Sequence, residues 1–89
     1  MNNYSYPIDP DWTRDELVAV IDFLNLVEQA NERGIETKTF LDGYQKFKTV
    51  VKSIGEEKRL GKEFESVSGY SLYRTVQKAE HTTSKSFKM

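Results

Sequence analysis

A helix start between Trp12 and Leu17 constrains this chain most, because three independent local signals agree on it. Thr13 and Glu16 have the spacing of a capping box, in which each side chain bonds the backbone N–H of the other residue. Trp12 and Leu17 flank the box at the spacing of a hydrophobic staple. Asp15 and Glu16 also bring negative charge to the positive end of the helix dipole. The body of the fold is therefore expected to open with a helix after Thr13.

Apolar residues continue at helical spacing beyond this start. Four helices are expected: one that Gly34 ends as a left-handed stop, one over residues 38–52, one from Ile54 and one over residues 70–80. Thr37 or Thr39 is expected to cap the second helix, and Ser53 the third. No alternating strand pattern exceeds four residues. The sequence thus predicts an all-α fold, a compact irregular array of about four helices.

The buried faces of the middle helices can be read from the same spacing. The second helix should bury Phe40, Tyr44, Phe47, Val51 and Ile54. The third should bury Leu60, Phe64 and Val67. Gly43 weakens the second helix by about 1 kcal/mol relative to Ala, so it is expected where another element approaches closely.

Both ends of the chain differ from this helical body. Residues 1–12 are expected to form an extended arm, because Pro7 and Pro10 disfavour helical geometry in the residues before them. Residues 81–89 show no periodicity, which predicts a mobile tail. Residues 1–80, arm included, are then the single domain.

Composition limits the core and the location. Hydrophobic residues make up 37% of 89 residues, against about 45–50% in an average globular chain, so a partner or self-association is expected to assist a small core. There is no cysteine, which excludes disulfides and thiolate metal sites. No stretch approaches the ~20 apolar residues of a membrane span, and the beginning of the chain lacks an export pattern. The cytoplasm is the expected compartment.

Charge is unevenly distributed along the chain. Residues 1–36 hold eight acidic and two basic residues, a net of −6, whereas residues 37–89 hold six acidic and eleven basic residues, a net of +5. Two interpretations stay open. Acidic and basic elements pack side by side in one fold, or the second part presents a basic face to an anionic partner.

No catalytic, cofactor or metal site is predicted. His81, the sole histidine, lies at the edge of the expected tail, so neither a Ser–His–Asp set nor a histidine-rich metal site can be assembled. Glu28 and Glu32 are one helical turn apart, but they fall on a predicted solvent face, where a hydrated surface is the plainer interpretation.

Aromatic residues near the two ends suggest a partner surface. The candidates are Tyr6, Trp12, Tyr70, Tyr73 and Arg74. Tyr70 and Tyr73 are expected one turn apart on the last helix, and tyrosine, tryptophan and arginine are enriched in interface hot spots. The alternative is that these aromatics complete a small core with their hydroxyl groups at its rim.

A basic stretch offers a second candidate surface, for an anion. It comprises Lys48, Lys52, Lys58, Arg59 and Lys62. Together these side chains can contact several phosphates. Glu56 and Glu57 lie within this stretch, Glu63 and Glu65 follow it directly, and the pI is 5.8, whereas dedicated nucleic-acid modules show a stronger imbalance.

Two strings of residues carry a family resemblance. They are Tyr6-Pro7-Ile8-Asp9 with Trp12-Thr13 and Glu16, and Ser68-Gly69-Tyr70-Ser71-Leu72-Tyr73-Arg74. Over about residues 4–80 the chain resembles uncharacterised protein family 0223, short proteins of low-GC Gram-positive bacteria, with residues 81–89 outside the resemblance. The resemblance implies a compact helical fold and a bacterial cytoplasmic location. It implies no activity, and therefore no site residues.

The leading functional hypothesis is a small protein-interaction or adaptor module, whose partner is an unidentified protein or a second copy of the chain. The absence of a catalytic constellation, the small core and the surplus of aromatics support it. The alternative is a nucleic-acid-associated protein that uses the basic stretch at residues 48–62.

Overall fold

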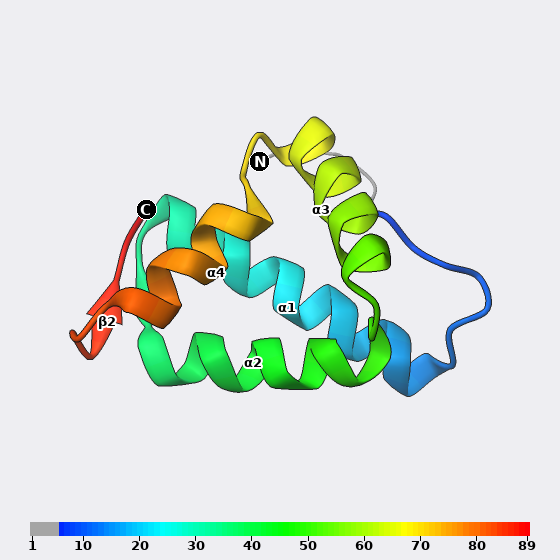
Figure 1. The fold of residues 1–89 in the computed structure, drawn as a ribbon, viewed down its shortest axis with the longest axis horizontal. Helices are drawn as coiled ribbons and strands as arrows, with labels where there is room; N and C mark the ends of the chain where they lie inside the picture. Colours follow the sequence, from blue (N-terminus) through cyan, green and yellow to red (C-terminus); the bar gives the residue numbers. More distant parts are fainter. Residues whose placement is uncertain (1–5) are drawn as a thin grey trace.

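The computed structural model describes residues 6–89, which form four helices and two short strands (Figure 1). The helices are α1 (Arg14–Glu32), α2 (Thr37–Val50), α3 (Ile54–Ser68) and α4 (Leu72–His81), and the strands are β1 (Ile35–Glu36) and β2 (Ser86–Phe87). The all-α fold class is confirmed. Helix α1 packs against α2, and α4 contacts the other three helices. Figure 1 shows α3 crossing the end of this assembly beside the N-terminal arm.

The start and end of α1 follow the local signals. Thr13 Oγ1 accepts the backbone N–H of Glu16 at 3.2 Å, and Glu16 Oε1 accepts the backbone N–H of Thr13 at 2.9 Å. The helix ends where Gly34 takes φ +96°, a left-handed geometry that favours glycine. The N–H groups of Arg33 and Gly34 both donate to the carbonyl of Gln29. Both ends of α1 are therefore determined by nearby residues.

Aromatic rings dominate the core between α1 and α2. The ring of Phe23 lies 5.2 Å from that of Phe40 and 4.7 Å from that of Phe47, measured between centroids, and all three side chains are fully buried. Gly43 lies opposite Leu26, and a Cβ atom at position 43 would overlap Leu26 Cδ1. The close approach expected at this glycine is confirmed.

The cap that was predicted for α2 is wrong. Helix α2 begins at Thr37, with Glu36 in the cap position, so neither Thr37 nor Thr39 caps it. The Thr39 hydroxyl donates to the Glu36 carboxylate at 2.7 Å, and the Thr37 hydroxyl donates to the carbonyl of Ser84 at 3.0 Å. Both hydroxyls thus have partners that helix periodicity does not reveal.

Two apolar positions at the ends of α3 are also exposed. Ile54 is 74% exposed because it opens α3 after the chain has changed direction at residues 51–53. Val67 is 41% exposed in the last turn, beyond Phe64, the last side chain of α3 that is buried. Ser53 caps this helix as expected, accepting the N–H of Glu56 at 3.0 Å.

The structure contradicts the mobile tail expected at residues 81–89. Strand β2 pairs antiparallel with β1, with Ile35 opposite Phe87, and the Phe87 side chain is buried. The N–H of Met89 donates to the carbonyl of Ala30 at 3.0 Å. A two-residue strand is too short to produce a period in the sequence. The domain therefore does not end at residue 80, because Phe87 belongs to its core.

The N-terminal arm has no helix or strand from Tyr6 to Asp9 and turns before α1. Of the predicted arm 1–12, residues 1–5 lie outside the described part of the chain. The N–H of Trp12 donates to the carbonyl of Asp9 at 3.1 Å. Tyr6 and Trp12, at the two ends of the described arm, both pack on the core.

Candidate functional site

The described part of the chain offers few groups for metal binding or catalysis. Within residues 6–89, no group of three or more His, Cys, Asp or Glu side chains could hold a metal ion. His81 is exposed at the end of α4, where its Nδ1–H donates to the carbonyl of Gln77 at 2.8 Å. In the same part of the chain, no helix is both long and apolar enough to cross a bilayer.

Tyr6 fastens the arm to α1. Its hydroxyl donates to the Glu28 carboxylate at 2.5 Å and lies 2.6 Å from Asn25 Oδ1, and its ring centroid is 6.1 Å from that of Phe64. Burial, together with the charge of Glu32, raises the pKa of the Tyr6 hydroxyl and that of the Glu28 carboxyl. This half-buried tyrosine positions the arm across α1 and α3.

Tyr70 makes an equivalent contact with Glu32, one helical turn from Glu28 on α1. Its hydroxyl donates to Glu32 at 2.7 Å, and this bond is the largest cause that raises the pKa of Tyr70. Tyr70 precedes α4, which begins at Leu72 after the cap Ser71, so Tyr70 and Tyr73 do not lie one turn apart on one helix. Glu28 and Glu32, expected on a hydrated face, are both tyrosine acceptors.

Trp12 lines a shallow groove between the arm and α3. The groove has a volume of about 270 Å³ and is lined by Pro7, Ile8, Asp9, Pro10, Trp12, Glu56, Arg59, Leu60 and Glu63. Trp12 is half-buried and packs against the core.

Tyr73 and Arg74 are the candidates that the structure leaves most accessible. Tyr73 is 67% exposed, and Arg74 beside it is also exposed, whereas Leu72 and Val76 on the same helix are buried. The Gln77 side-chain amide donates to the Tyr73 hydroxyl at 2.9 Å. Tyr73, Arg74 and Gln77 define the outer face of α4.

The basic stretch is exposed but divided. Lys48 lies with its Nζ 5.2 Å from the centroid of the Tyr44 ring, and Lys52 follows the end of α2. On α3, Arg59 lines the groove against the arm together with Glu56 and Glu63, and Lys62 lies one helical turn from both Lys58 and Arg59. The basic stretch is thus divided between two helices, and glutamates adjoin its α3 part.

Two polar junctions were not predicted from the sequence. Tyr44 donates its hydroxyl to Glu57 at 2.9 Å, and burial, followed by this bond, raises its pKa far above the usual value. Asn31 donates to the hydroxyl of Thr75, which is fully buried, at 3.0 Å. The position of Asn31 on the apolar stripe of α1 is the signal that would have revealed the second junction.

Comparison with known proteins decides the family. A family model described as "Uncharacterised protein family (UPF0223)" matches residues 3–88. The chain belongs to this family. The UPF0223 match extends past the expected residues 4–80 and includes β2, in keeping with the buried position of Phe87.

Relatives from three bacterial genera align with most of this chain. A UPF0223 protein of Enterococcus faecalis is 58% identical over 89 residues, which span all of this chain and 97% of the relative. One of Streptococcus gordonii is 56% identical over 80 residues, 90% of this chain and 87% of the relative. One of Listeria welshimeri is 48% identical over 86 residues, 97% of this chain and 96% of the relative. The family description, uncharacterised, assigns no activity to UPF0223 proteins.

Proposed function

We propose that this UPF0223 protein is a small non-enzymatic protein-interaction module of the cytoplasm, and that it contacts its partner through the outer face of α4. The exposure of Tyr73 carries the proposal: 67% of this aromatic side chain is open to solvent beside an exposed Arg74. Tyrosine and arginine are the residue types that most often supply binding energy at interface centres.

The hydrogen bond between Gln77 and Tyr73 supports this role. A side chain that is already held loses less conformational freedom when a partner docks, a cost of about 0.5–1.5 kcal/mol for a flexible side chain. The buried face of α4 fixes the position of the helix, so the outer face is presented on a rigid element.

The other aromatic candidates have a different part in this proposal. Tyr6 and Tyr70 use their hydroxyl groups on Glu28 and Glu32, and Trp12 packs on the core. They stabilise the arm and the α3–α4 connection. The partner surface therefore narrows to Tyr73 and Arg74.

The alternative, nucleic-acid binding through residues 48–62, has less support. Its five basic side chains are divided between the end of α2 and α3, and Glu56 and Glu63 line the same groove as Arg59. Acidic side chains at that position repel phosphate groups.

Capture from a native bacterial lysate tests the proposal. The full chain, a Tyr73→Ala/Arg74→Ala variant and a matched Gln45→Ala/Lys46→Ala control on α2 are each used as bait, with and without nuclease. The proposal expects a nuclease-resistant protein that the wild type and the control retain and the α4 variant loses. Light scattering after size exclusion covers the case in which the partner is a second copy. Equal capture by all three baits, with no change in mass, contradicts the proposal.

A further inference from the structure

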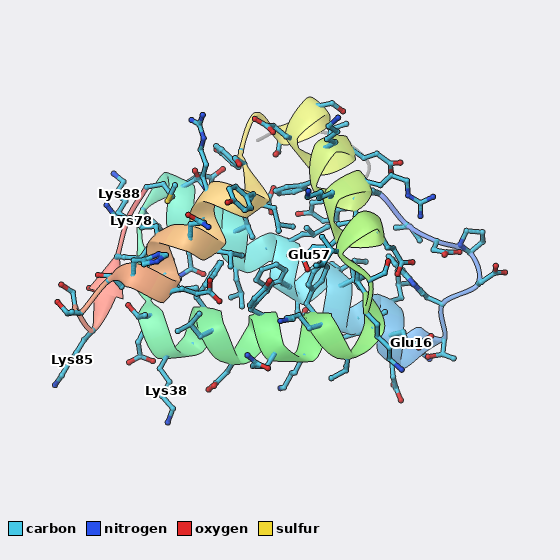
Figure 2. The ribbon with its side chains drawn as sticks, viewed as in Figure 1. Glu16, Lys38, Glu57, Lys78, Lys85 and Lys88 are labelled. Carbon is cyan, nitrogen blue, oxygen red and sulfur yellow. The ribbon has the colours of Figure 1, made fainter. Side chains whose placement is uncertain are left out.

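Basic side chains from separate parts of the chain gather at the end of the molecule that carries the β1–β2 sheet. Figure 2 shows Lys38, Lys78, Lys85 and Lys88 there, away from Glu16 at the opposite end. Arg33 belongs to the same end, since it precedes Gly34, where an added Cβ would lie 3.5 Å from Lys88 Cβ. We call these five exposed residues the basic end.

The pairing of the chain end brings them together. The N–H of Thr37 donates to the carbonyl of Lys85 at 2.7 Å, which places Lys85 beside the start of α2 and therefore near Lys38. Residues separated by more than 50 positions thus share one surface. The basic stretch at residues 48–62 is no part of it.

Few acidic groups oppose this charge. Glu36 is the sole acidic side chain in residues 33–39 and 82–89. Three other carboxylates lie near in sequence: Glu32, which accepts from Tyr70, and the exposed Asp42 and Glu80. Among residues 6–89, none of the five bases forms an ion pair.

Fold stability does not explain all of these charges. Arg33 and Lys78 lie at the C-terminal ends of α1 and α4, where the helix dipole favours a cation. Lys38 lies in the first turn of α2, where the same dipole disfavours one. Lys85 and Lys88 lie outside any helix. Three of the five cations therefore gain nothing from the helix dipoles.

We propose that the basic end binds the phosphate backbone of a nucleic acid. Several cations without carboxylate partners release counterions when they meet phosphates, and this is the main source of sequence-independent affinity. Exposed hydroxyl groups of Thr83, Ser84 and Ser86 stand among the lysines as additional phosphate donors. The proposal does not depend on the protein contact of α4, which involves other residues.

Fluorescence anisotropy with labelled single strands of RNA and DNA, about 20 nucleotides long, tests this binding. Five phosphate contacts predict a slope of about −3.5 for log affinity against log salt, so the affinity falls about 100-fold between about 50 and 200 mM salt. In the variant Lys85→Gln/Lys88→Gln, which loses two contacts, the slope is expected to become shallower, about −2. This variant should bind roughly 25-fold more weakly at about 0.1 M salt.

The variant Lys58→Gln/Lys62→Gln is the matched control, because it removes the same charge from α3. It is expected to bind either strand within about threefold of the wild type, since contacts outside the Debye length of about 10 Å are screened. If the change at the chain end loosens β2 by circular dichroism, Lys38→Gln/Lys78→Gln tests the same surface from two helices.

Three outcomes overturn the proposal. The first is no binding of either strand at about 50 mM salt. The second is an equal loss in the control, which places the contact on α3 or spreads it over the molecule. The third is binding to phosphatidylserine vesicles with none to nucleic acid.

Discussion

Phe87 packs edge-on against Phe40, with ring centroids 5.3 Å apart and ring planes at 88°. Phe87 lies in β2 and Phe40 in the first turn of α2, so the contact joins the end of the chain to the helical body. Both side chains are buried. The chain end is therefore a structural element that also brings Lys85 and Lys88 to the basic end.

Replacing Phe87 with alanine is expected to destabilise the fold by about 3–5 kcal/mol, because it leaves a cavity beside Phe40. Urea unfolding followed by circular dichroism measures this change. Met89→Ala, at an exposed neighbour in the same segment, is the control and should cost less than about 0.5 kcal/mol. A similar small cost for Phe87→Ala would show that residue 87 does not belong to the core.

Gly43→Ala is expected to destabilise the protein by up to about 2 kcal/mol: the overlap of its Cβ with Leu26 costs about 1–3 kcal/mol, and the better helix propensity of alanine offsets about 1 kcal/mol. Gly61→Ala is the matched control on α3. Its Cβ would lie 3.7 Å from Leu72 Cβ, an ordinary contact, so it should stabilise the protein by about 1 kcal/mol. Thermal unfolding of both variants decides the matter, and a shift of the same sign in both would contradict the close approach at Gly43.

Asn31→Ala should destabilise the protein by about 1–3 kcal/mol. The substitution removes the amide that donates both to the buried hydroxyl of Thr75 and to the carbonyl of Val27. Gln45→Ala, at an exposed position on α2, is a control of similar polarity. The difference between the two unfolding free energies isolates the junction. Equal values would mean that water replaces Asn31 without loss.

Alkaline pH should destabilise the protein, in part through Tyr44. Its pKa is raised in the folded state, so folding favours the protonated phenol, and this contribution is complete below pH 10. As the pH rises above 10, the unfolded state loses its proton first and stability falls by about 1.4 kcal/mol per pH unit for this one group.

Phenylalanine at position 44 cannot ionise. The free energy of unfolding of Tyr44→Phe should therefore fall less steeply above pH 10, by about 1.4 kcal/mol per pH unit, than that of the wild type. Urea midpoints between about pH 9 and 11 measure the slope. Equal slopes for the wild type and the variant would show that Tyr44 ionises equally easily in both states.

Local signals made most of the helical framework predictable. Thr13, Glu16 and Ser53 act within one turn of their own helices, and Gly34 adopts its left-handed geometry whatever lies opposite. Lys85 and Thr37 meet only after the chain has folded, and the two-residue strands leave no period to detect. The starts of α1 and α3 could therefore be predicted from the sequence, whereas the cap of α2 and the chain end could not.

The candidate surfaces depended on distant contacts in the same way. Tyr70 and Tyr73 look alike in the sequence, but one reaches Glu32, which lies 38 positions away, and the other faces solvent. Only the fold distinguishes an aromatic residue that closes a junction from one that a partner can reach.

The most direct test of the interaction proposal is the amount of nuclease-resistant protein that Tyr73→Ala captures per folded molecule, relative to the wild type. An exposed hot-spot tyrosine contributes about 2 kcal/mol or more to binding and little to folding. We expect Tyr73→Ala to unfold at the same urea concentration as the wild type and to capture its partner at least roughly tenfold less. Unchanged capture, or unfolding of the variant, would contradict the assignment of Tyr73 to a partner surface.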